Sequence, residues 1–262
     1  MSKYDNCKVC GEYKVITKEH IPPRSTFNKS TILQFPHEQI TDSMVGNRLP
    51  WDYNGFKFKQ KQGGNTFLTL CKECNSFMGT HYIPEYNRIT NEIVRSLKQE
   101  NVIINGSREF TILNFKPLNF IKEVVAMFCS LNELTKIEPV ITNFLLNKYE
   151  NKFPSRYKIL MNIFAGGLIK ANGFSACFCN NKLYVVSEIA SVPFHFALIS
   201  NANDLCDEDF YGLGTDITEL INYKYDEELN VALTLNIREL NTIIPFDFRT
   251  KKQVEEAWSV KE

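Results

Sequence analysis

The residues best suited to chemistry are four cysteines in two pairs of equal spacing. Cys7 and Cys10 form the first C-x-x-C pair, and Cys71 and Cys74 form the second. Four thiolates in such pairs supply the tetrahedral ligand set of a structural zinc site. An accidental pair or a redox role for the sulfurs is the alternative, but the equal spacing favours zinc.

A second group of polar residues lies beside these cysteines. Glu19 and His20 precede two prolines, Asn65 follows two glycines, and Asn75 comes directly after the last cysteine. A neutral imidazole titrates near physiological pH and can accept a proton from water. Mg²⁺ prefers oxygen ligands and needs only one or two protein groups besides a substrate phosphate. The acid, the histidine and the amide therefore predict a second, catalytic cation site.

In this order, the segments resemble those of the HNH endonucleases, whose ββα-metal, treble-clef-like site is often held by two zinc knuckles. The resemblance covers roughly residues 5–90. It implies that His20 is the general base and that Glu19 and Asn75 bind a catalytic Mg²⁺ or Mn²⁺. It also implies that Asn65 hydrogen-bonds across a hairpin and holds the histidine in place. The reaction expected from the resemblance is hydrolysis of DNA phosphodiester bonds.

Other residues are further candidates for this site. Thr66 and Asn54 are alternatives for the orienting role. Lysines at alternate positions of a strand can follow a phosphate backbone, although a half-buried strand with a solvated face explains them equally well. A histidine beyond the second cysteine pair is either a phosphate contact or an exposed loop residue. The candidate substrate-binding residues are Lys57, Lys59, Lys61 and His81.

Composition limits the class of protein. The chain has 262 residues, 44% of them hydrophobic, and no formal net charge. Residues 1–100 contain 14 Lys and Arg against 10 Asp and Glu, so the part with the motifs is net basic by four. This excess weakly favours a partner with phosphate groups, and the resemblance implies that this nucleic acid is DNA rather than RNA. There is no apolar run of membrane-spanning length and no signal-peptide core, which predicts a cytoplasmic protein with reduced thiols.

The elements that position these residues predict an α+β fold. We expect a nuclease domain over residues 1–100, with an insertion at 25–62, and a mixed helix and antiparallel-sheet domain over 101–262. The first domain should contain a hairpin that ends near His20, a strand before Cys71, a short helix from Cys74 to Gly79, and a longer helix. Hydrophobic periodicity and helix-breaking residues predict helices over 85–99, 117–132 and 138–149, and a last helix after Arg249. We expect a hairpin turn at Asn105-Gly106 and antiparallel strands from Tyr157 onward.

The region 101–262 has no motif that indicates chemistry. We interpret it as a domain for target recognition, regulation or assembly, and as a candidate surface for a protein partner or for homo-oligomerisation. By analogy, nucleases with such an added domain act in restriction or anti-phage defence. The alternative to an enzyme is a non-catalytic zinc-knuckle module that binds nucleic acid or another protein.

Overall fold

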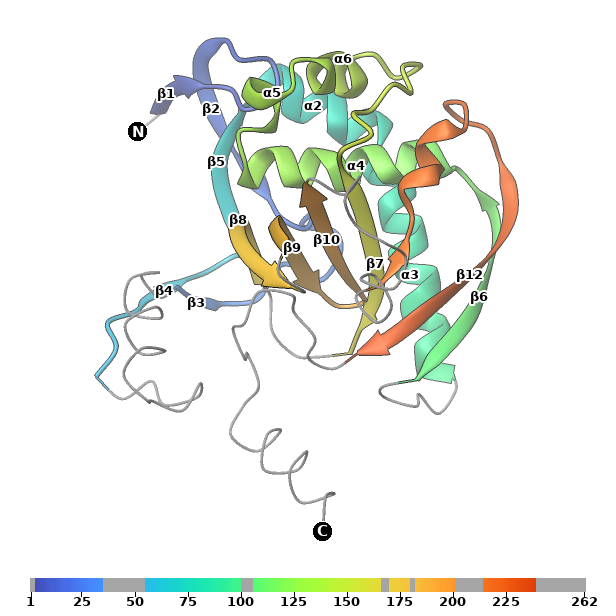
Figure 1. Cartoon of the computed structure of the whole chain (residues 1–262). Helices are drawn as coiled ribbons and strands as arrows, with labels where there is room; N and C mark the ends of the chain where they lie inside the picture. Colours follow the sequence, from blue (N-terminus) through green and yellow to red (C-terminus); the bar gives the residue numbers. More distant parts are fainter. Residues whose placement is uncertain are drawn as a thin grey trace.

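A computed structural model describes residues 3–34, 55–99, 106–165, 170–179, 182–200 and 214–238. The fold is of the α+β class, as the sequence predicted, with three sheets and a set of helices (Figure 1). The expected turn at Asn105-Gly106 and the expected helix after Arg249 involve residues outside the described ranges. None of the described helices combines the length and the apolar character that a membrane span requires.

The N-terminal part is a three-stranded antiparallel sheet followed by two helices. The sheet order is β1-β2-β5, and a separate pair, β3-β4, leaves it as a small ribbon. Its strands are β1 (Lys3–Asn6), β2 (Tyr13–His20), β5 (Thr66–Cys71), β3 (Ile32–Gln34) and β4 (Lys59–Lys61). The helices are α2 (Lys72–His81) and α3 (Ile83–Gln99). Helix α2 starts earlier than expected, directly after Cys71, and continues through Gly79.

The C-terminal part is a large sheet with helices packed on it. Its order is β6-β12-β7-β10-β9-β8, with β11 beside β7; all pairs are antiparallel except β12 with β7. The strands are β6 (Ser107–Phe115), β7 (Lys158–Phe164), β8 (Lys170–Cys179), β9 (Lys182–Ser191), β10 (Phe194–Ser200), β11 (Thr215–Asp216) and β12 (Leu229–Arg238). The remaining helices are α4 (Pro117–Leu131), α5 (Leu134–Ile137), α6 (Val140–Leu146) and the 3₁₀ helix η2 (Thr218–Asn222). The single helix expected at 138–149 is therefore shorter.

Helix α4 is the centre of the molecule. Its apolar residues pack on both sides: Phe120 lies 5.6 Å from the Tyr86 ring of α3 and 5.9 Å from the Phe194 ring of β10, centroid to centroid. Proline at the first helical position and an almost wholly apolar sequence explain why the helix forms and why it is buried. One continuous core runs from Cys7 to Ile237, so the expected boundary near residue 100 does not separate two cores.

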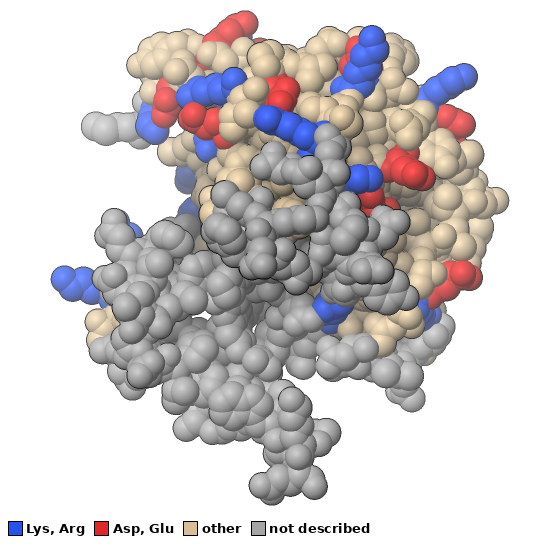
Figure 2. Space-filling view, in the orientation of Figure 1, with Lys and Arg blue, Asp and Glu red and all other residues tan. Residues whose placement is uncertain are grey.

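Charge is mixed on the surface that Figure 2 shows. Lysine and arginine side chains alternate with aspartate and glutamate side chains over the upper part of the described surface. No field of a single sign covers this described face, so positive charge that could attract a phosphate backbone has to be local.

Candidate metal centre and active-site pocket

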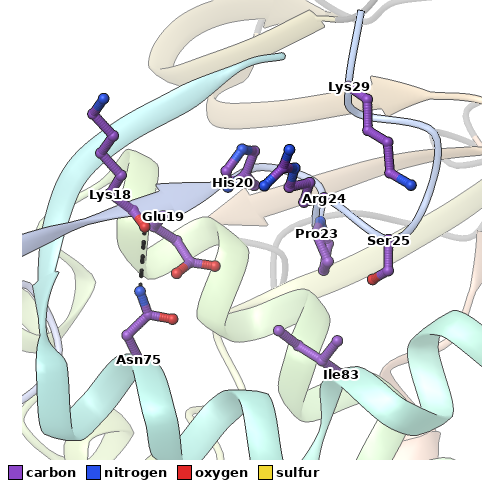
Figure 3. A pocket seen from close by; sticks show the side chains of 9 residues that line it. All are labelled: Lys18, Glu19, His20, Pro23, Arg24, Ser25, Lys29, Asn75 and Ile83. Atoms are coloured by element: carbon purple, nitrogen blue, oxygen red, sulfur yellow. Dashed lines mark hydrogen bonds between the residues drawn. The ribbon is translucent and has the colours of Figure 1, made fainter. Parts of the chain in front are cut away.

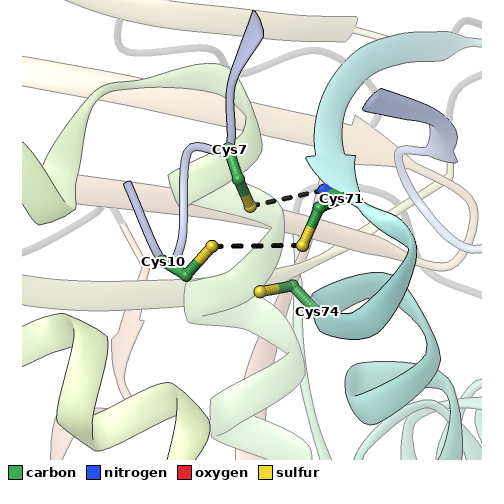
Figure 4. Close-up of side chains that lie close together, drawn as sticks. All are labelled: Cys7, Cys10, Cys71 and Cys74. Carbon is green, nitrogen blue, oxygen red and sulfur yellow. Dashed lines mark hydrogen bonds between the residues drawn. The ribbon is translucent and has the colours of Figure 1, made fainter. Parts of the chain in front are cut away.

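The four cysteines converge from two distant segments. Cys7 and Cys10 lie in the turn between β1 and β2, Cys71 ends β5, and Cys74 lies in the first turn of α2 (Figure 4). The four Sγ atoms lie within 4.8 Å of one another, and those of Cys10 and Cys71 are 3.9 Å apart. Sulfurs bound to one tetrahedral zinc ion are about 3.8 Å apart, given a Zn–S bond of about 2.3 Å. This group can hold a metal ion such as zinc.

Hydrogen bonds stabilise the thiolate form of Cys7 within this cluster. The backbone N–H of Cys71 donates to the Cys7 sulfur at 3.3 Å. A hydrogen bond from the Cys74 thiol lowers the pKa of Cys7 to about 4. The same hydrogen bond raises the pKa of Cys74, and burial raises the pKa of Cys71 to about 11. A bound cation would replace the thiol protons that these sulfurs share in its absence.

A pocket opens beside the metal centre, at the end of β2. Its volume is about 490 Å³, and residues from β2, the following loop, α2 and α3 surround it (Figure 3). The lining residues are Lys18, Glu19, His20, Pro23, Arg24, Ser25, Lys29, Asn75 and Ile83. Three predicted site residues, Glu19, His20 and Asn75, therefore share one cavity.

Glu19 is a buried acid for which the described residues provide no hydrogen-bond donor or cation. Its side chain is buried in the pocket floor, and burial raises its pKa to about 7. Within the described residues, no donor or cation acts on this carboxylate to offset that rise. The strand register shifts between Thr17 and Lys18, and the inward-facing positions of β2 are Ile16 and Glu19, three residues apart. This irregularity turns the acid toward the pocket and the core.

Asn75 presents an oxygen to the same pocket. Its Nδ2 atom donates to the Thr17 hydroxyl at 3.0 Å and to the Lys18 carbonyl at 3.3 Å. These bonds fix the amide, so that Oδ1 is the atom left to accept; in Figure 3 it lies on the side of the Glu19 carboxylate. A carboxylate and an amide oxygen fit the ligand preference of Mg²⁺ and Mn²⁺.

The ring of His20 is held by a backbone carbonyl. Its Nε2 atom lies 3.1 Å from the carbonyl oxygen of Gly63. Because a carbonyl only accepts, Nε2 carries the proton and Nδ1 keeps its lone pair. Burial lowers the pKa of His20, and the nearby Arg24 and Lys61 add to this effect. The imidazole is therefore neutral at neutral pH, and in the described part of the chain its Nδ1 has no hydrogen-bond partner.

Asn65 stabilises the backbone next to His20 rather than the ring itself. Its Nδ2 donates to the Ile21 carbonyl at 3.3 Å, and its own carbonyl accepts from the Ile21 N–H at 3.1 Å. The fully buried Asn28 side chain joins the same two backbone segments. It accepts from the Asn65 N–H at 2.7 Å and donates to the Pro22 carbonyl at 2.7 Å. Together these bonds fix the end of β2 that carries the histidine.

The alternatives for the orienting role contribute less in the part described. Thr66 lies opposite His20 in the strand pairing, where its carbonyl accepts from the Lys61 ammonium. Asn54 lies outside the described residues.

The candidate substrate-binding residues lie outside the pocket. Lys57 and Lys59 are exposed on the β3-β4 ribbon and its approach, and Lys61 turns back toward Thr66. The Nδ1 atom of His81 and the Tyr225 hydroxyl are hydrogen-bonded at 3.0 Å, and the His81 ring packs on Phe77. Only Lys61 acts on His20, through its charge.

Three cations of the pocket were not predicted from the sequence. Lys18, Arg24 and Lys29 line it, and no acid among the described residues forms an ion pair with any of them. Arg24 comes directly after Pro22 and Pro23, four residues beyond His20, so its position next to the motif was the available signal. The sequence contained no signal for Lys29, because residue types do not predict the loop that brings it back to the pocket.

Comparison with protein-family models, with curated proteins and with solved structures gave no match to this chain.

Proposed function

We propose that this chain is a metal-dependent endonuclease of the HNH type, in which β2, β5 and α2 form the treble-clef-like ββα-metal module. The observation that supports it best is the single pocket that contains Glu19, His20 and Asn75. An acid, a histidine with a free nitrogen and an amide oxygen are what phosphodiester hydrolysis with one cation requires. Zinc bound by the four cysteines would have a structural role, fixing α2 against the hairpin.

His20 is the general base in this proposal. The Gly63 carbonyl fixes the tautomer, so Nδ1 can take a proton from a water molecule as that water attacks phosphorus. The lowered pKa of His20 keeps this nitrogen unprotonated at neutral pH. Asn65 and Asn28 act as positioning residues, because they fix the backbone on which the ring is mounted.

Glu19 and Asn75 hold the catalytic Mg²⁺ or Mn²⁺. When bound, this cation stabilises negative charge on the phosphate and on the departing oxygen. The buried Glu19 carboxylate, which has no donor among the residues that the structure describes, supplies the negative charge that binds it. The Asn75 amide, fixed by Thr17 and Lys18, supplies a neutral oxygen in constant orientation.

Lys18, Arg24 and Lys29 bind the phosphate groups of the substrate. They surround the acid and the histidine, and the described residues offer them no acidic partner. The preference for DNA over RNA and a role in anti-phage defence come from the resemblance to HNH endonucleases and are part of the same proposal.

Cleavage of end-labelled duplex DNA, single-stranded DNA and RNA of one sequence tests this function. We expect cleavage that requires Mg²⁺ or Mn²⁺, favours DNA and is abolished in Glu19→Gln with unchanged zinc content. Binding of DNA without cleavage under any cation would instead favour the non-catalytic zinc-knuckle module.

A further inference from the structure

Exposed apolar side chains cover the outer face of the N-terminal sheet. Tyr4 of β1 and Tyr13 of β2 are 60% and 70% exposed, and their rings stack with centroids 6.0 Å apart. Val15 lies opposite Tyr4 in the strand register and is 38% exposed, and Leu68 of β5 lies opposite Lys18 and is 45% exposed. The solvated face of an antiparallel sheet is ordinarily polar, so these four apolar residues, here called the tyrosine face, indicate a binding surface.

The tyrosine face continues along β2 to the pocket. The inward positions of this strand are Ile16 and Glu19, so Val15 and Lys18 both lie on its outer side. Lys18 also lines the pocket, and Figure 3 shows its side chain leaving β2 on the side opposite to Glu19. His20 comes two residues after Lys18 in the same strand, so it shares this outer side. The exposed surface and the proposed general base therefore belong to one continuous face.

The length of this face matches a short stretch of nucleic acid. Tyr13 and His20 are seven residues apart, which is about 23 Å of strand at about 3.3 Å per residue. A stacked nucleic-acid strand rises about 3.4 Å per nucleotide, so about seven nucleotides cover this distance. A strand that places one phosphate at His20 can therefore bring its neighbouring bases to the two tyrosines.

The chemistry of the tyrosine face suits bases better than phosphates. The lysines next to the two tyrosines in the sequence are paired with acids: Lys3 with Asp5 at 2.6 Å, and Lys14 with Glu12 at 2.7 Å. Lys18, at the pocket end, forms no ion pair with the residues that the structure describes. Exposed aromatic rings stack on bases of any sequence, and bases offer their faces only where they are unpaired. Base stacking at one end and a phosphate contact at the other are thus expected.

A second copy of the chain suits this surface less well. A stable dimer buries roughly 800 Å² per partner, and four partly exposed side chains supply well below that area. Strand β1 lies at the edge of its sheet, but it has only four residues and starts with an exposed lysine. Short, charged edge strands disfavour pairing with another chain.

Building on the proposed function, we propose that the tyrosine face binds unpaired bases of the nucleic-acid strand that is cleaved in the pocket. Tyr4 and Tyr13 stack on these bases, and Val15 and Leu68 add apolar contact. Lys18 binds the phosphate between the tyrosine face and the pocket. The preferred substrate is then a nucleic acid with a single-stranded segment beside the cleavage site.

The test is binding of the full zinc-loaded chain to labelled DNA in Ca²⁺, measured by fluorescence anisotropy with a blunt duplex and with the same duplex carrying a single-stranded overhang. The wild type should bind the overhang DNA more tightly. Tyr13→Ala should weaken binding of the overhang DNA by about 5- to 100-fold and change binding of the blunt duplex by less than about twofold. Tyr13→Trp keeps a stacking ring and should retain tight binding. The matched control is Tyr149→Ala, a tyrosine that is also 70% exposed but lies outside the N-terminal sheet, and it should bind as the wild type does.

The outcomes separate this inference from the proposed function. Equal affinity of the wild type and Tyr13→Ala for the overhang DNA, within about twofold, overturns the inference and leaves the nuclease intact. Overhang binding that depends on Tyr13, but without cleavage when Mg²⁺ replaces Ca²⁺, supports base binding by the tyrosine face and overturns the proposed function. A dimer that sedimentation detects in the wild type and not in Tyr13→Ala assigns this face to a second copy and overturns the inference.

A further measurement covers the case in which Tyr13→Ala loses its zinc or does not fold. The wild type is then titrated with overhang DNA that carries 2-aminopurine at each unpaired position in turn. Fluorescence quenched on binding at one or more positions shows a stacked base and supports the inference, provided that Tyr4→Ala removes the quenching. Unchanged fluorescence at every position overturns it.

Discussion

The His20 Nε2 atom lies 3.1 Å from the Gly63 carbonyl oxygen, and this contact sets which nitrogen of the ring is free. The carbonyl can point there because Gly63 and Gly64 both adopt positive φ angles, +83° and +87°. Only glycine adopts this conformation readily. The two glycines before Asn65 thus help to fix the tautomer that the proposed general base requires.

Gly64→Ala should damage this arrangement. A Cβ atom at Gly64 would overlap the backbone and side-chain oxygens of Asn28, in a backbone conformation that L residues rarely adopt. We expect a loss of about 1–3 kcal/mol in the free energy of unfolding, measured by urea denaturation, together with slower cleavage. Gly79→Ala in α2 is the matched control: its Cβ meets nothing within 4 Å, and alanine should stabilise the helix by about 0.5–1 kcal/mol.

Zinc should be required for the fold around the pocket. The cysteine cluster joins the β1-β2 turn to the start of α2, and structural zinc contributes about 10–16 kcal/mol in small peptides. We expect about one zinc ion per chain by atomic emission, and a melting temperature that falls when a strong chelator removes it. Cys74→Ser should lose the metal. Cys129→Ser, a buried cysteine outside the cluster, should keep it, and loss of zinc in that control would contradict the assignment.

Cation affinity should depend on pH through Glu19. The pKa of its carboxyl is about 7 because it is buried, so below pH 7 the cation has to displace a proton and above pH 7 it does not. Affinity should therefore fall as pH falls, being about tenfold weaker at pH 6 than at pH 8. Calorimetric titration with Mn²⁺ measures this change. His20→Ala should keep the same dependence, whereas a pH-independent affinity in the wild type would exclude Glu19 as the titrating ligand.

The pocket cations should determine how DNA binding depends on salt. Arg24→Ala and Lys29→Ala each remove one expected phosphate contact, which should reduce the slope of log K against log salt by about 0.9 for each variant. Fluorescence anisotropy with labelled duplex DNA, in a buffer with Ca²⁺ in place of Mg²⁺, gives these slopes. Lys136→Ala changes an exposed lysine far along the chain, paired with Glu133, and should leave the slope unaltered. Equal slopes in all three variants would rule out the pocket as the phosphate site.

The sequence predicted the parts of the site that lie in short, regular motifs. Equal C-x-x-C spacing identified the four sulfurs that converge, and Asn75 directly after Cys74 is brought to the pocket by the first turn of α2. Helices α3 and α4 follow from periodicity and from the proline at position 117, because burial of an apolar face is the main force that forms them.

The parts that the sequence did not predict depend on contacts between distant segments. The Gly63 carbonyl and Asn28 act through their positions after folding, and their residue types alone give no indication of these roles. Helix α4 packs against the N-terminal elements as closely as against the large sheet, so composition along the chain could not show that the core is continuous. The lysines of the β3-β4 ribbon occur at alternate positions, as the phosphate-binding prediction required, but they are not among the residues that line the pocket.

The most direct test of the account is the rate of supercoiled-plasmid nicking in Mg²⁺ or Mn²⁺, measured for the wild type, His20→Ala and His81→Ala at equal zinc content. Loss of the general base should slow nicking by roughly 10²–10⁴ in His20→Ala while DNA binding stays nearly intact. His81→Ala should nick at a rate close to that of the wild type, because His81 bonds to Tyr225 outside the pocket. Equal nicking by the wild type and His20→Ala would contradict the central claim.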